Sequence, residues 1–328
     1  MKILIISNTF WSIYNFRSSF IKKFIENKNE VLVASLKDKN VKKLKKIGSK
    51  IYFIDIFSKN TNPWKEIILL FQLKNLFKEY KPDVVINFTI KPIIYSSLLL
   101  KTKKVKVINT LDGFGLSLTK NFFFKKMIFF LFRISQSKIF KFYAVTNNDY
   151  ELLKEKNLIP REKLSLINGT GINLKHYNYT KPNNKKNTVF IFIGRFLLLK
   201  GIKLFVEASG IVKKKYKNTS FIAIGDFKED NYSISKKELD LWKKNKVVKF
   251  IKPRDDIRNL ISKSDCMVLP TTYPEGINRS LLESLSMGRP AITNKIGGCK
   301  QIIKNNFNGY IKVIKNKNDL ANMMIKFH

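Results

Sequence analysis

Residues 270–290 read PTTYPEGINRSLLESLSMGRP, and this stretch decides the fold class. The apolar run Cys266–Pro270 leads into it and predicts a buried strand, because strands of parallel sheets are apolar on both faces. Asn278 is a favourable helix N-cap, and Gly288 with Pro290 marks the end of a helix. The stretch therefore predicts a strand, a loop and a helix whose N-terminal N–H groups form a site for an anion.

The same alternation of short apolar runs and amphipathic stretches continues along the chain in both directions. It predicts an α/β fold in which parallel sheets carry helices on both faces. The predicted strands cover Lys2–Ser7, Glu30–Ser35, Lys50–Ile56, Asp83–Phe88, Val105–Thr110, Phe140–Thr146, Lys163–Asn168, Thr188–Ile193, Ser220–Ile224, Lys246–Ile251, Cys266–Pro270 and Ala291–Thr293. The predicted helices include Tyr14–Asn27, Pro63–Tyr80, Lys200–Lys214, Asp255–Ser262 and Asn278–Met287.

A polar segment interrupts this alternation. Thr180–Asn187 reads TKPNNKKN and contains no apolar residue, so we interpret it as a linker. It divides the 328 residues into an N-terminal domain, residues 1–180, and a C-terminal domain, residues 181–328. Because open α/β sheets bind ligands at the carboxyl ends of their strands, we expect the two domains to face each other across a cleft.

The net charge of +39 would suit nucleic acid or an anionic membrane. However, only eight of the 63 basic residues are Arg, and the Lys are spread along the whole chain. This spread, together with the lack of a recognisable nucleic-acid-binding module, favours compositional drift with membrane attraction as a by-product. We therefore expect a membrane surface as a partner and no nucleic acid.

The composition also limits the chemistry and the compartment. Two Cys, two His and the absence of an Asp-x-Asp sequence predict neither a disulfide framework nor a metal site. The sequence shows no signal peptide and no uninterrupted apolar stretch of about 18 residues. We therefore expect a cytoplasmic protein that lies on the inner face of the membrane without crossing it.

A second informative stretch is FIFIGRFLLLKG, residues 190–201. Gly194 and Arg195 follow a predicted strand, and Lys200 opens the next predicted helix. The planar fork of an Arg and the point charge of a Lys both suit a diphosphate. The alternative is that both residues are ordinary surface cations.

Two carboxylates accompany the predicted anion site. Glu275 precedes the helix, and Glu283 lies eight residues later inside it. A phosphate at the helix N-terminus would then have one carboxylate on the sugar side and another on the ribose side. The spacing leaves a second interpretation open, in which Glu275 is a turn residue and Glu283 a solvated helix carboxylate.

Together these stretches resemble the C-terminal domain of family 4 glycosyltransferases, which have the GT-B fold of two Rossmann-like domains. INGTGINLKHY, residues 167–177, and AITNKIGGCKQIIKNNFNGYI, residues 291–311, resemble the interdomain and closing segments of that family. The family's G-R-x4-K-G stretch binds the donor diphosphate, and its Glu-x7-Glu motif places one Glu at the transferred sugar and one at the donor ribose. The resemblance implies a nucleotide-sugar site, with UDP as the expected nucleotide, formed by Gly194, Arg195, Lys200, Arg254, Gly276, Ile277, Asn278, Ser280 and Glu283.

The N-terminal half is similar to a subgroup that extends polyprenyl-diphosphate-linked sugars in surface glycan assembly. The matching segments are SIYNFRSSFIKKF, residues 12–24, and NTLDGFG, residues 109–115. The similarity implies that Asn15, Arg17 and Gly113 bind the acceptor. It also implies that Asp112 lines the reacting centre, where many members carry a His.

The resemblance implies a retaining, metal-independent transfer of a hexose or N-acetylhexosamine to a lipid-linked or glycan acceptor, with no cofactor. The implied catalytic residues are Glu275, Asp112, Arg195 and Lys200. Two alternatives stay open, namely a nucleotide-sugar epimerase of the same fold and a basic nucleic-acid-binding protein. Family members usually end with a helix that crosses back to the N-terminal domain, and we expect this chain to lack the full crossover helix.

The segment KNFFFKKMIFFLFRISQSKIF, residues 120–140, combines aromatic residues with flanking cations. A helix of this composition can lie in a bilayer interface. A helix that packs on the sheet would need a similarly wide apolar stripe. Both interpretations stay open, and they hold together if the helix has two different faces.

Overall fold

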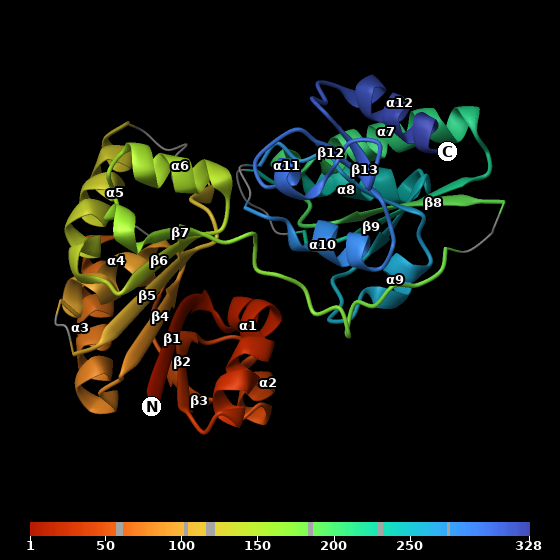
Figure 1. Ribbon diagram of the computed structural model, residues 1–328. Coiled ribbons are helices and arrows are strands. Elements are labelled where there is room, and N and C mark those ends of the chain that lie inside the picture. Colours follow the sequence, from red (N-terminus) through yellow and green to blue (C-terminus); the bar gives the residue numbers. More distant parts are fainter. Residues whose placement is uncertain (57–61, 102–103, 116–121, 183–185, 228–231, 274–275) are drawn as a thin grey trace. The chain divides into compact units, whose positions relative to one another are not determined.

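The computed structural model describes residues 1–56, 62–101, 104–115, 122–182, 186–227, 232–273 and 276–328 (Figure 1). The chain forms two compact units, Met1–Thr170 and Gly171–His328. The division therefore falls between Thr170 and Gly171 rather than at the predicted boundary between residues 180 and 181.

The position of this division has a physical reason. Tyr177 is buried against Ile261 and Met287 of the second unit. The backbone carbonyl of Thr180 accepts a hydrogen bond of 2.8 Å from Nη1 of Arg289. The chain is thus held by the second unit before it reaches the polar segment that predicted a linker.

In the described residues of unit 1, parallel strands form one sheet in the order β3-β2-β1-β4-β5-β6-β7. The strands are β1 Lys2–Thr9, β2 Glu30–Leu36, β3 Lys50–Phe53, β4 Val84–Phe88, β5 Lys106–Leu111, β6 Lys141–Ala144 and β7 Leu164–Leu166. The helices are α1 Phe10–Glu26, α2 Val41–Lys46, α3 Pro63–Tyr80, α4 Ile90–Leu99, α5 Phe122–Ser135 and α6 Asn147–Glu155, with short 3-10 turns at Gln136–Lys138 and Arg161–Lys163.

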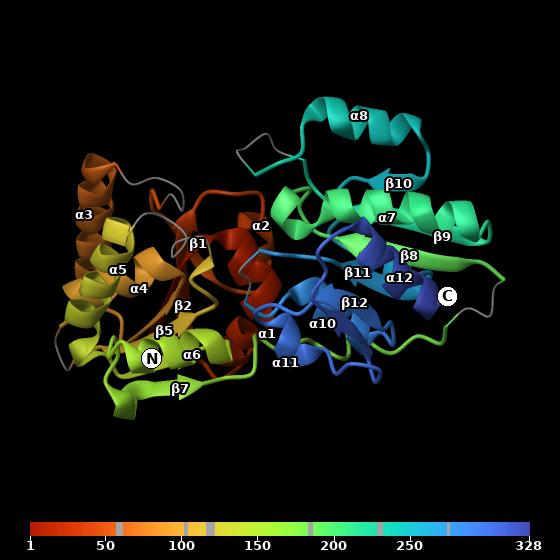
Figure 2. The same ribbon diagram turned by 90° about the horizontal axis from the view of Figure 1, so that it is seen from above.

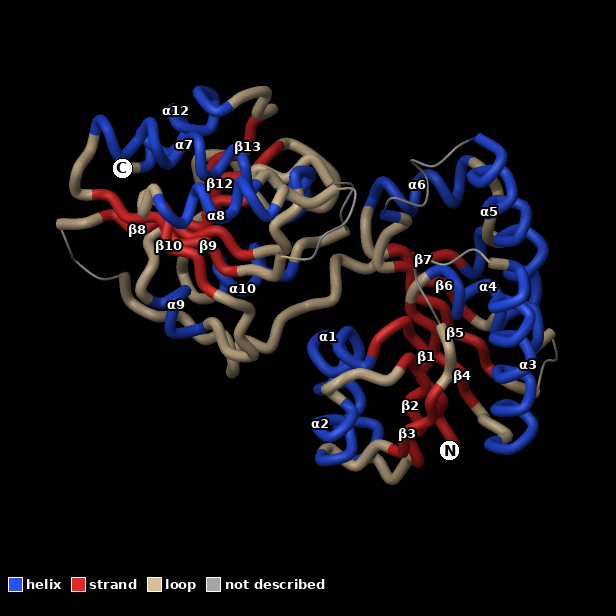
Figure 3. Tube along the Cα trace, turned by 180° about the vertical axis from the view of Figure 1, so that it is seen from behind, coloured by secondary structure: helices blue, strands red, loops and turns tan. Residues whose placement is uncertain are grey.

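Helices cover both faces of this sheet because successive side chains of a strand point to opposite faces. In β1, Ile3 and Ile5 pack in one core with α1 and α2. Leu4 and Ile6 pack in another core with α3. The helices α4 and α5 lie on the same side as α3, as Figure 3 shows from behind.

In the described part of unit 2, parallel strands form a second sheet in the order β10-β9-β8-β11-β12-β13. The strands are β8 Thr188–Ile193, β9 Thr219–Ile224, β10 Val248–Ile251, β11 Cys266–Leu269, β12 Ala291–Asn294 and β13 Gly309–Lys312. The helices are α7 Ile202–Lys215, α8 Lys236–Lys244, α9 Arg258–Ser262, α10 Arg279–Ser286, α11 Cys299–Ile302 and α12 Lys317–Phe327, and a 3-10 turn covers Leu198–Lys200. Figure 2 shows α7 and α12 side by side over this sheet.

Two helices begin later than the sequence pattern predicts. The helix expected at Lys200–Lys214 begins at Ile202, because Leu198–Lys200 is a 3-10 turn that ends in the left-handed Gly201. The helix expected at Asp255–Ser262 begins at Arg258, where the Asp256 carboxylate accepts the backbone N–H at 3.0 Å. In both places a local turn supplies the hydrogen bonds that a further helical turn would have made.

Arg289 is a large cation buried in unit 2, where the residue is 1% exposed. Its guanidinium donates to the carbonyl oxygens of Ile261 at 3.2 Å and Ser262 at 2.8 Å, in addition to Thr180. Burial lowers the pKa of this side chain. Arg289 thus connects the segment by which the chain enters unit 2 to the C-terminal end of α9.

We expect Arg289→Lys to lower the free energy of unfolding by about 3 kcal/mol. The single ammonium of Lys cannot donate to all the carbonyl oxygens that the guanidinium of Arg289 contacts, so some of these oxygens would stay buried without a donor. Urea denaturation followed by circular dichroism measures this difference. The matched control is Arg161→Lys, since Arg161 is exposed in unit 1. Equal unfolding midpoints for the two variants would contradict the structural role of Arg289.

Candidate functional site

The two stretches that predicted an anion site meet at the carboxyl ends of β8 and β11, which are neighbours in the sheet. The carbonyl oxygen of Leu199 accepts hydrogen bonds from the backbone N–H groups of Thr272 at 2.8 Å and Tyr273 at 2.9 Å. The hydroxyl of Thr271 donates to the same oxygen at 3.1 Å. The loop after β8 and the loop after β11 therefore form one structure.

Two glycines allow this close approach. A Cβ on Gly201 would lie 2.4 Å from the carbonyl oxygen of Pro270, and the residue has a φ of +81°. A Cβ on Gly225, which follows β9, would lie 1.9 Å from the carbonyl oxygen of Gly194. Gly225 was not predicted from the sequence, because it stands alone after a strand and belongs to neither stretch.

Helix α10 begins beside the end of β8. The side chain of its N-cap Asn278 accepts from the backbone N–H of Leu281 at 3.3 Å. The hydroxyl of Ser280 lies 3.0 Å from the carbonyl oxygen of Ile193 and 2.7 Å from Oδ1 of Asn278. The predicted N-cap is thus present, and it directs the N-terminus of α10 towards the loop that carries Gly194.

Gly276 and Ile277, which precede α10, lie against the loop after β12. A Cβ on Gly298 in that loop would lie 2.3 Å from the carbonyl oxygen of Gly276 and 2.7 Å from the backbone nitrogen of Ile277. Gly298 is part of the closing segment quoted above, where sequence reasoning assigned it no role. Its lack of a side chain lets the third loop pack against the start of α10.

The predicted cations differ in their surroundings. Lys200 is 9% exposed, and its Nζ lies 5.0 Å from the centre of the Tyr273 ring. Arg195 is exposed directly after β8. Arg254 is exposed after β10, which lies two strands from β8 in the sheet. The structure therefore brings Arg195 and Lys200 to the same strand end, whereas Arg254 lies at the edge strand.

Glu283 is not a solvated helix carboxylate, because it is 6% exposed. Its Oε1 accepts a hydrogen bond of 2.7 Å from Nε of Arg279, one helical turn earlier. The Arg279 guanidinium lies 5.9 Å from the centre of the Tyr177 ring. Burial, together with the negative charge and hydrogen bonding of Glu283, raises the pKa of Tyr177 to about 12. The second predicted carboxylate, Glu275, lies outside the described residues.

Arg279 and Tyr177 were missed in the sequence. Arg279 could have been predicted as a partner of Glu283, because it stands four residues earlier on a predicted helix and therefore lies on the same face. Tyr177 could not have been predicted, since it lies in the segment between the domains, far from Glu283 in the chain. The partners of Glu283 therefore come from the structure.

In unit 1, Arg17 and Asp112 form an ion pair with 2.7 Å between Nη2 and Oδ1. Arg17 is 8% exposed, and its guanidinium lies 4.3 Å from the centre of the Phe88 ring. Burial raises the pKa of the Asp112 carboxyl, although the charge of Arg17 opposes the shift. The predicted acceptor cation and the predicted reacting-centre carboxylate are thus one pair.

The other two residues predicted for the acceptor lie close by in the chain. Gly113 directly follows Asp112 and has a φ of +135°, which only glycine adopts readily. The side-chain amide of Asn15 donates to the carbonyl oxygen of Trp11 at 2.8 Å, within α1.

Thr89 has a φ of 72° and a ψ of 157° between β4 and α4, and its hydroxyl donates to Oδ1 of Asn8 at 2.9 Å. A strained non-glycine backbone is typical of functional sites. The strain at Thr89 had no sequence signal.

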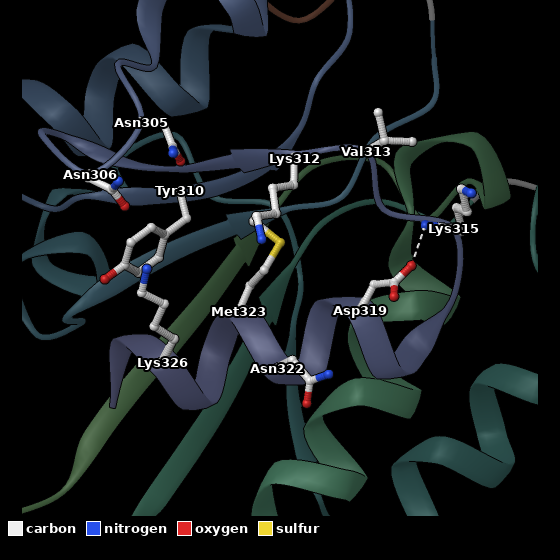
Figure 4. A pocket seen from close by; sticks show the side chains of 10 residues that line it. All are labelled: Asn305, Asn306, Tyr310, Lys312, Val313, Lys315, Asp319, Asn322, Met323 and Lys326. Atoms are coloured by element: carbon white, nitrogen blue, oxygen red, sulfur yellow. Dashed lines mark hydrogen bonds between the residues drawn. The ribbon is translucent and has the colours of Figure 1, made fainter.

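One cavity of about 640 Å³ lies in unit 2 between β13 and α12 (Figure 4). Its lining includes Tyr310, Lys312 and Lys326, with the ammonium of Lys326 4.9 Å from the centre of the Tyr310 ring. None of the residues predicted to bind the donor lines it. The cavity belongs to the edge strand of the sheet and is separate from the ends of β8 and β11.

Within the described ranges, no group of three or more His, Cys, Asp or Glu side chains is arranged to hold a metal ion. In the same part of the chain, none of the helices combines the length and the apolar character that crossing a bilayer requires.

Two family models match the chain. Residues 2–146 match the model described as glycosyl transferase 4-like, and residues 178–328 match that of the glycosyl transferases group 1. Among curated relatives, an N,N'-diacetylbacillosaminyl-diphospho-undecaprenol alpha-1,3-N-acetylgalactosaminyltransferase of Campylobacter jejuni is 27% identical over 98% of this chain and 88% of its own length. A UDP-Gal:alpha-D-GlcNAc-diphosphoundecaprenol alpha-1,3-galactosyltransferase of Escherichia coli is 25% identical over 84% of this chain and 74% of its own length.

Solved structures show the same fold. Alr3699/HepE of Anabaena, solved in complex with UDP-glucose, superposes with a TM-score of 0.78 at 19% identity, over 99% of this chain and 89% of its own. The lipopolysaccharide biosynthesis glycosyltransferase WaaG superposes with a TM-score of 0.72 at 15% identity, over 99% of this chain and 90% of its own. The predicted fold class, α/β with two Rossmann-like domains of the GT-B type, is confirmed.

The matches favour a transferase over the epimerase and the nucleic-acid-binding protein that the sequence had left open. The matched segments include the stretches around Arg195, Lys200 and Glu283 in unit 2 and those around Arg17 and Asp112 in unit 1. The chain belongs to the glycosyltransferase family that joins a glycosyl transferase 4-like N-terminal domain to a group 1 C-terminal domain.

Proposed function

We propose that this glycosyltransferase moves a sugar from a UDP-sugar to a polyprenyl-diphosphate-linked glycan, with retention of configuration and without a divalent metal. The observation that carries the proposal is the shared strand end in unit 2. Arg195 directly follows β8, and the turn that ends in Lys200 is hydrogen-bonded to the loop after β11. The start of α10 contacts the end of β8 through Ser280. The curated relatives named above act on undecaprenol-linked diphosphates, which supports the same acceptor class here.

The donor roles follow from the charge that develops in the reaction. Breaking the bond between sugar and phosphate leaves negative charge on the diphosphate, and an enzyme without a metal must stabilise it with its own cations and N–H groups. We assign this task to Arg195, Lys200 and the N-terminus of α10, whose backbone dipoles favour an anion. Gly194, Gly276, Ile277, Asn278 and Ser280 shape this site, and Arg254 completes the proposed donor set at the edge.

The two carboxylates take different parts in the proposal. Glu283 is held by Arg279, so its remaining oxygen lone pairs have a defined direction for ribose hydroxyls. We assign Glu275 to the transferred sugar, where positive charge develops in the reaction.

We place the acceptor diphosphate near Arg17 and its reacting hydroxyl near Asp112 and Gly113. Asn15 contributes from the same helix as Arg17. The ion pair keeps the Asp112 carboxylate in one orientation, and its raised pKa makes it a better proton acceptor than an ordinary Asp. A lipid-linked acceptor also requires that the enzyme work at a bilayer, and we propose the cytoplasmic face of the membrane.

Replacing Arg195 or Lys200 with Ala should weaken donor binding by about 1.5–3 kcal/mol each, since each removes a charge-assisted contact with the diphosphate. Isothermal titration calorimetry with UDP-sugars measures the change. Lys203→Ala is the matched control, because Lys203 is an exposed cation of α7 whose ammonium pairs with Glu238. If both site variants bound the donor as the control does, the diphosphate role would be wrong.

Glu283→Gln should raise KM for the donor with little change in kcat, because a ribose contact is made equally in the ground state and the transition state. Arg279→Ala should give the same profile and add little to Glu283→Gln in the double variant, since both act on one interaction. Glu275→Gln should instead lower kcat. Steady-state kinetics over a range of donor concentrations separates these cases, and one shared profile for all three single variants would refute the division of roles.

Turnover should persist in excess EDTA, because the proposed charge stabilisation comes from cationic side chains and N–H groups. The assay is release of UDP in the presence of a polyprenyl-diphosphate-linked acceptor, with a known metal-dependent glycosyltransferase as the control. Loss of activity in the chelator, restored by magnesium or manganese, would show that a metal takes part.

A further inference from the structure

Helix α3 exposes an apolar stripe on the side that faces away from the sheet. Trp64, Ile67, Ile68 and Phe71 are 75%, 43%, 51% and 61% exposed, and their spacing places them on one side of the helix. Leu69, Leu73 and Leu76 are buried in the core between the helix and the sheet. Packing in the core of unit 1 therefore explains why the inner stripe is apolar, but it does not explain why the outer stripe is apolar.

Helix α5 also has two apolar faces. Ile128 and Phe132 are buried with α4. Phe122, Phe123, Met127 and Phe130 are 65%, 80%, 48% and 62% exposed. The packing interpretation is thus confirmed for the buried face, and the bilayer interpretation stays a prediction for the exposed face.

The two outer stripes belong to one surface. Helices α3 and α5 lie in the same layer on one face of the unit 1 sheet, with α4 between them (Figures 1 and 3). Every residue of α4 is described, and none of them is exposed. The lipid-facing surface, as we name it, consists of Trp64, Ile67, Ile68, Phe71, Phe122, Phe123, Met127 and Phe130.

The charges next to the exposed rings are mainly cationic, and the exposed carboxylate of α3, Glu79, lies two turns past Phe71. Lys65 and Lys74 are exposed on α3, and the ammonium of Lys126 on α5 lies 4.5 Å from the centre of the Phe122 ring. The described helix α5 contains no acidic residue. Glu66 of α3 is turned inward, where its carboxylate pairs with Lys91 and accepts from the Tyr95 hydroxyl at 2.7 Å. Exposed aromatic rings bordered by cations match the interface of an anionic bilayer, whereas a second copy would bring cations against cations.

We propose that α3 and α5 together form a two-helix contact with anionic lipid, in which both helices lie in the plane of the bilayer interface. This inference rests on the proposed function, because a polyprenyl-linked acceptor is itself held in the membrane. It adds α3 as the second anchoring element. It also sets the sheet of unit 1 about one helix diameter, roughly 10 Å, above the lipid.

Flotation with vesicles of phosphatidylglycerol and phosphatidylcholine, and with phosphatidylcholine alone, tests the proposal at low and high salt. The wild-type chain should float with the anionic vesicles, and a salt-resistant fraction should remain because buried rings are not screened. The double variants Trp64→Ser/Phe71→Ser on α3 and Phe123→Ser/Phe130→Ser on α5 should each lower the partition coefficient at high salt about tenfold or more. The matched control is Leu241→Ser/Phe307→Ser, which removes two exposed apolar side chains from unit 2.

A second readout follows α3 directly. Tryptophan emission should shift to shorter wavelength and be quenched by lipids that carry a nitroxide near the headgroup. Trp64→Phe should lose most of this quenching yet still float, because Phe keeps most of the buried apolar area. Circular dichroism of every variant checks that it is folded.

Several outcomes would overturn the proposal. The α3 variant could float as the control does, or a folded wild-type chain could stay unbound with anionic vesicles at low salt. A dimer in sedimentation that the α3 variant abolishes, without flotation, would identify a second copy as the occupant. Donor calorimetry separates this test from the proposed function, since the α3 variant should bind UDP-sugar as the wild type does. A chain that floats but binds no donor would refute the transferase proposal and leave the lipid contact standing.

Discussion

The proposed donor site of this glycosyltransferase depends on one hydrogen-bond acceptor, the carbonyl oxygen of Leu199. It takes hydrogen bonds from the loop that follows β11, so the two loops cannot move apart without leaving backbone groups without partners. The approach is possible only because Gly201 and Gly225 have no side chain where Pro270 and Gly194 pass. The position of Lys200 follows from this junction, because Lys200 directly follows Leu199 in the chain.

Polar groups buried in unit 1 have a comparable role beneath the proposed acceptor site. The side-chain amide of Asn87 on β4 donates to Asn109 on β5 at 2.9 Å, and Asn109 donates in turn to Ser97 at 2.9 Å and to Gln136. Such a network holds strands and helices in a single register, because each unmet donor in the core is costly. Asn109 opens the segment that resembles an acceptor motif, yet it is fully buried and supports β5 just before Asp112.

Two helices of unit 1, α3 and α5, each have a buried apolar face and an exposed apolar face. The helices of unit 1 bury one stripe to stabilise the sheet, and α3 and α5 keep a second apolar stripe in contact with solvent. A monomer in water gains nothing from this arrangement, so the outer stripes point to a partner. From the sequence, we interpreted the high positive charge as compositional drift. Where cations border the exposed rings of α3 and α5, the same charge would favour contact with an anionic membrane.

The sequence by itself determined the α/β class, the approximate bounds of α3 and β8, the N-cap at Asn278 and the segments that carry Arg195, Lys200 and Glu283. These features depend on local signals, such as hydrophobic period, capping residues and glycine at strand ends. Only the tertiary structure decided which segments meet. Arg17 pairs with Asp112 across 95 residues, and Thr272 donates to Leu199 across 73. The Tyr177 ring lies beside Arg279, the residue that pairs with Glu283. The order of strands in a sheet sets these pairings, and local periodicity does not encode that order, because a buried parallel strand reads the same wherever it lies in the sheet.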